Sequence, residues 1–195
     1  MLRIFFVLIG YSFFSSSVLA QGWQDMTKEE FQEYRLSISY RPDKLIPLAE
    51  QEIPWAMADL AWLYHIGMDE DDYPAYRVRI EQDKCKALKL FDKAARKHNA
   101  YAQSFLALSY ILGSGVQESC FNSYKWAIAA TKNGKSKDDL FEIKSCEKKL
   151  SPKEIEEANH FMPENSHPIE IIDFPNTIFF NGLVRPYIGG HSCKW

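Results

Sequence analysis

Residues 60–67 read LAWLYHIG, and residues 106–113 read LALSYILG. A second pattern follows each copy and recurs 35 residues later, with Cys85, Phe91, Ala94 and Ala95 matched by Cys120, Trp126, Ala129 and Ala130. A helical repeat of this size is typical of solenoids, in which no unit buries its apolar face alone and neighbouring units stack. The repeat therefore predicts an all-α fold built from stacked helix pairs.

Six helices are expected to build the repeats, over residues 55–67, 83–97, 100–113, 120–133, 137–149 and 152–161. Gly67, Gly113 and Gly134 stand where helices are expected to stop, in the left-handed conformation that glycine adopts readily. Ser151 is the expected N-cap of the last helix, with Glu154 completing the capping signal.

Two further helices are expected before the repeats. The first starts at Thr27, because Thr27 and Glu30 have the spacing of a capping box. The second runs from Asp43 to Gln51, with Pro47 in its first turn, where the missing N–H costs little. This second helix is interpreted as part of a degenerate N-terminal unit, as is common at the ends of repeat arrays.

The N-terminus predicts export. Residues 1–20 contain one positively charged side chain, Arg3, followed by the apolar run 4–14 and a small residue, Ala20, at the expected cleavage site. This is the pattern of a cleaved secretory signal peptide, and the apolar run is shorter than the roughly 20 residues that a spanning helix needs. The expected organisation is a signal peptide at 1–20, capping helices at 21–54, the repeat solenoid at 55–161 and an extended tail at 162–195. An uncleaved membrane anchor is the disfavoured alternative.

The tail and one insertion break the period. The tail is rich in proline and lacks helical periodicity, so it is predicted to be extended and laid over the helices, with a hairpin turning at Asn181-Gly182. Between Gly67 and Cys85 lie 17 residues, against 6 between Gly113 and Cys120, so the first unit carries 11 extra residues. Insertions in repeat proteins map to loops on one face, often the binding face.

Four cysteines follow the signal segment, and this even number favours two disulfides in an oxidising compartment. Cys85 and Cys120 occupy equivalent positions in successive units, too far apart for a bridge. Cys120 begins one helix and Cys146 ends the next, and antiparallel packing brings those ends together. The predicted pairs are therefore Cys120–Cys146 and, by elimination, Cys85–Cys193.

The formal net charge is −3 for the whole chain and −4 once Arg3 is removed, with acidic and basic residues interleaved. Such a chain has no basic face for nucleic acid or for an anionic membrane. The length favours one domain, and a soluble periplasmic or secreted monomer is expected.

The pattern A-x-x-x-L-A-x-L-Y-x-x-G, followed by a loop and K-A-x-x-x-F-x-x-A-A, resembles the Sel-1-like repeat, a relative of the tetratricopeptide repeat. The first copy spans Ala56 to Gly67 with Lys86 to Ala95, the second Ala102 to Gly113 with a G-x-G-V turn, and residues 43–161 are covered. The first copy lacks that turn, and the tail has no counterpart in the motif. The resemblance implies a right-handed solenoid of antiparallel helix pairs that holds other proteins. It implies no chemistry.

Catalytic and metal-binding patterns were weighed against this interpretation. His160, His167, His191 and Cys193 have no standard ligand spacing, and the acidic run 69–72 lacks the glycine and glutamate of a calcium loop. Motifs of the types G-x-S-x-G and H-E-x-x-H are absent from the sequence. We therefore expect neither catalysis nor a cofactor nor a metal.

The function expected from the sequence is that of an exported protein-binding solenoid acting as adaptor, regulator or inhibitor. An immunity protein against a toxin delivered into the periplasm is one form of this role. The alternative is a β-lactam-binding or weakly hydrolytic protein of the cysteine-rich type in this family, although those members have two cysteines in every repeat and this chain does not.

Two groups of residues are predicted to contact the partner. Asp59, Trp62 and Leu108 are expected to face an inner groove formed by the first helix of each pair. The insertion is expected to add Tyr73, Tyr76, Arg77 and Arg79, since aromatic residues and arginine are enriched at binding hot spots. The alternative for Trp62 is burial beneath the insertion or the tail, and the sequence leaves both open.

Overall fold

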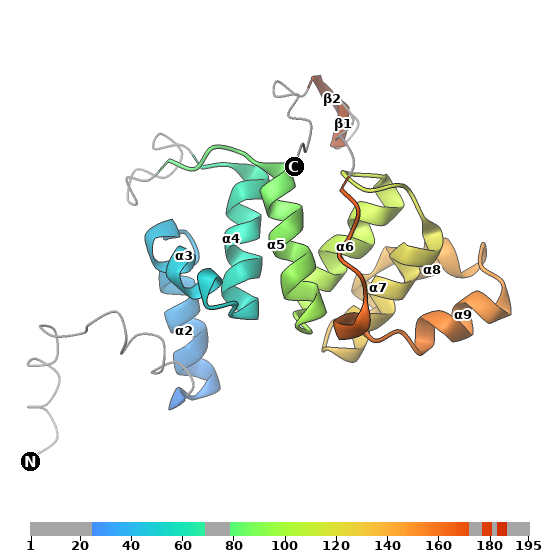
Figure 1. The fold of residues 1–195 in the computed structure, drawn as a ribbon, viewed down its shortest axis with the longest axis horizontal. Coiled ribbons are helices and arrows are strands. Elements are labelled where there is room, and N and C mark those ends of the chain that lie inside the picture. The colour runs from blue at the N-terminus through green and yellow to red at the C-terminus, as the bar shows by residue number, and fades with distance from the viewer. Residues whose placement is uncertain (1–24, 69–78, 172–176, 181–182, 187–195) are drawn as a thin grey trace, which may run out of the picture.

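A computed structural model describes residues 25–68, 79–171, 177–180 and 183–186 of the chain. The helices are α2 (Lys28–Ile38), α3 (Pro42–Glu50), α4 (Pro54–Ile66), α5 (Lys84–Arg96), α6 (Ala100–Leu112), α7 (Cys120–Lys132), α8 (Phe141–Glu147) and α9 (Pro152–Asn159). Two 3₁₀ helices, η2 (Lys137–Asp139) and η3 (Pro163–Asn165), and two short strands, β1 (Thr177–Phe180) and β2 (Leu183–Pro186), complete the described elements. The packed body is all-helical, which confirms the predicted all-α fold class (Figure 1).

Capping residues set the start of the first and the last of these helices. The Thr27 hydroxyl accepts the Glu30 backbone N–H, and the Glu30 carboxylate accepts the Thr27 N–H at 2.8 Å. Ser151 and Glu154 form the same reciprocal pair at the start of α9. Both predicted capping boxes are therefore confirmed.

The two copies of the sequence pattern form equivalent helices. Each of α4, α5, α6 and α7 has 13 residues. The link from α4 to α5 is closed by the Asp83 N–H donating to the Tyr64 carbonyl at 2.8 Å, and the link from α6 to α7 by the Ser119 N–H donating to the Tyr110 carbonyl at 3.0 Å. From α3 to α8, each helix packs on the next along the chain (Figure 1).

Small residues let these helices approach closely. Ala94 and Ala95 of α5 are fully buried, as is Ala107 of α6, and Phe91 and Leu106 fill the space between them. A side chain longer than the alanine methyl group would not fit at these buried positions. The repeated alanines therefore fix the spacing between the packed helices.

The structure differs from the predicted helix over 137–149, which it divides into η2 and α8. Leu140 separates them, with φ of −110° and ψ of 87°, and its side chain is buried. Burying this leucine requires a break in the helix, and helical periodicity alone does not show such a break. The prediction for Pro47 was also wrong, because α3 begins at Pro42 and places Pro47 in its second turn.

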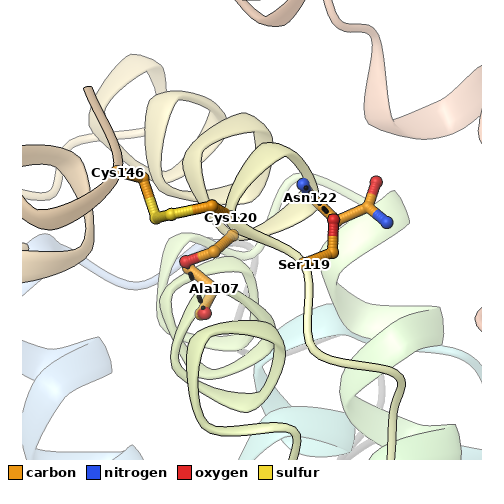
Figure 2. Close-up of a disulfide and its surroundings, with 6 residues drawn as sticks. Ala107, Ser119, Cys120, Asn122 and Cys146 are labelled. Atoms are coloured by element: carbon orange, nitrogen blue, oxygen red, sulfur yellow. Dashed lines mark hydrogen bonds between the residues drawn. A yellow bond between two sulfur atoms is a disulfide. The ribbon is translucent and has the colours of Figure 1, made fainter. Parts of the chain in front are cut away.

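The disulfide Cys120–Cys146 is confirmed, with the two Cα atoms 5.3 Å apart (Figure 2). It joins the first residue of α7 to the last turn of α8, beside the Ser119 side chain that caps α7 by accepting the Asn122 N–H at 3.1 Å. Cys85 is also disulfide-bonded. The partner predicted for it, Cys193, lies outside the described residues.

The described segment that follows α9 contacts the helices. Phe161 meets Trp126 edge-on with ring centroids 4.9 Å apart, and Glu164 pairs with His98 at 3.3 Å. Ile169 and Ile171 are buried. Farther along, β1 and β2 pair antiparallel, with Phe180 opposite Leu183, and the expected turn residues Asn181 and Gly182 lie outside the described residues. Within the described parts of the chain, no helix has the length and apolar character needed to cross a bilayer.

Replacing Cys120 and Cys146 together by alanine should lower the free energy of unfolding by about 3 kcal/mol, because the bridge closes a loop of roughly 25 residues in the unfolded chain. Urea denaturation measures the loss. Thr27→Ala is a control at the opposite end of the fold and should cost about 1 kcal/mol through its lost cap. A double variant as stable as the wild type would contradict a stabilising role for this bridge.

Candidate partner-binding groove

A hollow of about 400 Å³ lies across α2, α4 and the start of α6. Its lining residues, which we call the Trp62 groove, are Gln32, Arg35, Leu36, Ser39, Tyr40, Asp59, Trp62 and Tyr101. The structure thus brings together Asp59 and Trp62, two of the residues predicted to contact a partner. It adds the side chains of α2 opposite them.

An ion pair spans the floor of the groove. The Arg35 guanidinium donates through Nε to one Asp59 oxygen at 2.7 Å and through Nη2 to the other at 2.5 Å. This hydrogen bonding raises the pKa of Arg35 despite partial burial. Both carboxylate oxygens of Asp59 are therefore occupied, and the guanidinium is held in one orientation. The pair also links α2 to α4.

Trp62 is the exposed end of a connected aromatic cluster. Its side chain is 36% exposed, and its ring stacks on His65 with centroids 5.7 Å apart. His65 meets Phe105 edge-on at 4.8 Å, and Phe105 stacks on the fully buried Phe91 at 3.9 Å. Tyr101 contacts both Phe91 and Trp62, so the five rings form a closed set of contacts.

Trp62 is partly packed and partly exposed, and its predicted contact with a partner stays a prediction. One part of the indole packs on His65 and Tyr101, and the rest lines the groove and meets solvent. A side chain held in this way keeps its orientation without a partner, so little conformational entropy remains to be lost on binding.

Burial shifts the titration of two members of the cluster. It lowers the pKa of His65 to about 4, with a smaller contribution from the positive charge of Lys84. His65 is therefore a neutral ring at pH 7, suited to stacking on Trp62. Burial, with the nearby Asp59 charge, raises the pKa of Tyr101 to about 12, so its hydroxyl keeps its proton and can donate a hydrogen bond.

Two polar side chains of the groove are engaged by hydrogen bonds within the protein. Its only serine among the lining residues, Ser39, donates its hydroxyl proton to the Leu36 carbonyl at 3.0 Å. Asp59 is engaged by Arg35 and is not hydrogen-bonded to Ser39 in the described structure. No set of three or more metal-binding side chains gathers among the described residues.

The other predicted contact residues have different positions. Leu108 is half-buried on α6 and does not line the groove cavity, and Arg79 is exposed just before α5. Tyr73, Tyr76 and Arg77 lie outside the described residues, so their predicted role is untested.

The neck of the insertion is closed by backbone pairing. Met68 and Ile80 exchange two hydrogen bonds of 2.8 and 2.9 Å, and both side chains are buried. The Gln82 amide donates to the carbonyl of His65, in the last turn of α4, at 2.8 Å. The insertion therefore leaves the helix pair beside the aromatic cluster.

Sequence reasoning missed Arg35, Leu36, Tyr40 and Tyr101. The sequence did contain a signal for the α2 residues, because α3 is interpreted as part of a degenerate N-terminal unit. On that interpretation α2 is the first helix of the same unit and lies beside the first helix of the next, which is where the structure places its groove residues.

The His65 titration predicts acid sensitivity. Since the pKa is about 4 in the folded state and about 6.5 in the unfolded chain, the unfolded state binds an extra proton in this window. His65 therefore contributes stability that is lost as the pH falls from about 6.5 to 4. The wild type should lose about 2–3 kcal/mol more than His65→Phe between pH 7 and pH 4.5. Urea denaturation at several pH values measures this difference, and parallel profiles would contradict it.

No protein-family model matches the chain, and no curated protein is significantly similar to it in sequence.

Proposed function

We propose that this protein is an exported binding protein of the Sel-1-like type, a right-handed solenoid of antiparallel helix pairs that holds a segment of another protein in the Trp62 groove. The observation that carries the proposal is the groove itself. In it, a partly exposed tryptophan and an oriented arginine flank a hollow of about 400 Å³ that crosses three helices. Tryptophan and arginine are among the residues that dominate binding energy at interfaces.

The solenoid arrangement is supported by the equivalence of the two helix pairs. Their helices have equal lengths, and their linkers are closed by the same backbone contact, from Asp83 to Tyr64 and from Ser119 to Tyr110. Stacked units of this kind produce an extended surface from corresponding helices. In this interpretation α2, α4 and α6 are the corresponding first helices, and the groove runs across them.

Export into the periplasm or the extracellular space is supported by the Cys120–Cys146 disulfide, which is compatible with an oxidising compartment. The signal peptide proposed for residues 1–20 lies outside the described residues. An adaptor, a regulator of signalling and an inhibitor would all use such a groove. An immunity protein that neutralises a periplasm-delivered toxin is the inhibitor form of the proposal.

The groove can be tested with Trp62→Ala and a matched control. Chemical cross-linking of the wild type in periplasmic extract, followed by mass spectrometry, identifies the captured partner. Trp62→Ala should weaken its affinity by about 2 kcal/mol or more. Phe141→Ala removes an aromatic side chain that is 51% exposed and lies outside the groove, and it should bind like the wild type.

Thermal denaturation is the control for folding in this experiment. Trp62→Ala should unfold only a few degrees earlier, because the indole is partly exposed while Phe91 and Phe105 keep their stacking. Unchanged partner affinity in Trp62→Ala, or a collapse of its melting temperature, would assign Trp62 to the core and contradict the proposal.

The insertion can be tested by replacing it with the short turn of the second copy. Gly67 and Gly113 occupy equivalent places at the ends of α4 and α6. Each lies against a residue just before the next helix, Gln82 for Gly67 and Glu118 for Gly113. Residues 68–82 can therefore be exchanged for the sequence Ser-Gly-Val-Gln-Glu of residues 114–118, whose Val116 is fully buried.

This exchange should preserve the helical circular dichroism spectrum and reduce partner affinity, because it removes the exposed Arg79 together with Tyr73, Tyr76 and Arg77. Affinity equal to that of the wild type would exclude the insertion from the interface.

A further inference from the structure

Arg35 and Tyr101 supply hydrogen-bond donors to the Trp62 groove. Arg35 carries more N–H groups than one carboxylate accepts, and only its Nε and Nη2 donate to Asp59. The Tyr101 hydroxyl adds a donor whose pKa is about 12. The one carboxylate that lines the groove, Asp59, has both oxygens engaged by Arg35.

Apolar surface lies next to these donors. Leu36, which follows Arg35 in α2, is 73% exposed, and Trp62 on the opposite wall is 36% exposed. An exposed leucine and an exposed tryptophan on the walls of one hollow form an apolar patch of the kind that partners cover. A ligand that complements the groove therefore has an anionic acceptor next to an apolar group.

A cation lies near the same end of the groove. The Lys135 amine is 5.6 Å from the centre of the Tyr101 ring. Lys135 does not line the groove, but its charge lies over the ring of Tyr101, which does. Recognition of an anion here depends on these local groups, since the chain as a whole does not attract anions over long distances.

We propose that the Trp62 groove recognises an acidic side chain adjacent to a large apolar side chain in an extended segment of the partner protein. The partner's carboxylate accepts hydrogen bonds from the free N–H groups of Arg35 and from the Tyr101 hydroxyl, and its apolar neighbour packs between Leu36 and Trp62. A basic segment is disfavoured because the Asp59 side chain is only 12% exposed, against 37% for Arg35, so the guanidinium is the more accessible partner of the pair. This inference rests on the proposed function, because it specifies what the groove of a binding protein selects.

The test uses the full-length mature protein and a set of acetylated, amidated hexapeptides Gly-Ser-X-Z-Ser-Gly. Position X is Leu, Phe or Gly, and position Z is Glu, Gln or Lys. Binding is measured by ligand-observed nuclear magnetic resonance, which detects millimolar affinities. For X of Leu or Phe, the Glu peptides should bind about fivefold more tightly than the Gln peptides, the value expected for a charge-assisted hydrogen bond to an oriented arginine. The Lys peptides and the Gly peptides should bind most weakly.

Two variants show whether the preference arises in the groove. Arg35→Gln combined with Asp59→Asn replaces the ion pair by neutral groups of similar shape, and it should bring the Glu and Gln peptides to equal affinity. Arg41→Gln is the matched control, because Arg41 pairs with Asp43 at 2.9 Å on the surface and does not line the groove. It should keep the wild-type preference. Tyr101→Phe removes only the hydroxyl and should reduce the preference in part.

Three results would overturn the inference: equal affinity of the Glu and Gln peptides in the wild type, a preference for Lys, and no detectable binding of any peptide. If the Glu and Gln peptides bind equally and Trp62→Ala abolishes both, the proposed groove stands and the acidic specificity is wrong. If Trp62→Ala also leaves capture of the cross-linked partner unchanged, the proposed function fails as well.

Discussion

Close packing of helices at alanine is the constraint on which the rest of the structure depends. Ala56 and Ala61 of α4 are fully buried, as are Ala102 and Ala107 of α6, so only a methyl group projects into the core at each of these positions. Larger side chains at these positions would force the helix backbones apart. The spacing then determines which large side chains fit between the helices, and Phe91 on α5 is the clearest example.

The core also supports the Trp62 groove through a chain of aromatic contacts. Phe91 is fully buried and supports Phe105 and Tyr101, which in turn position His65 and Trp62. Aromatic contacts with the core thus hold Trp62 and Tyr101 in place, and the ion pair with Asp59 holds Arg35. A rigid surface of this kind binds with a smaller loss of conformational entropy than a flexible one.

The sequence predicts the features that depend on local pattern or on the repeat. The α4–α5 and α6–α7 pairs follow from the repeated LA-x-x-Y-x-x-G pattern, and the Cys120–Cys146 bridge follows from the antiparallel packing of neighbouring helix ends. The 35-residue shift that equated Cys85 with Cys120 was one residue short, because α5 begins at Lys84 and α7 begins at Cys120. The break at Leu140 could not be predicted, because it depends on how deeply that side chain is buried in the assembled core. The Arg35–Asp59 pair joins residues 24 positions apart on two helices, and sequence periodicity within either helix contains no information about it. The lowered pKa of His65 has the same origin, since it requires a buried environment that exists only after folding.

The disulfide has a consequence for how the chain opens at its C-terminal side. α8 has only 7 residues and buries Ile143 and Cys146 as its main apolar anchors. A helix this short, with few buried anchors, is an element that local unfolding opens readily. The Cys120–Cys146 bond ties α8 to the first turn of the longer α7, so that this local opening cannot separate the two elements. In an environment that contains proteases, a covalent tie at this point would slow cleavage that depends on local opening of α8.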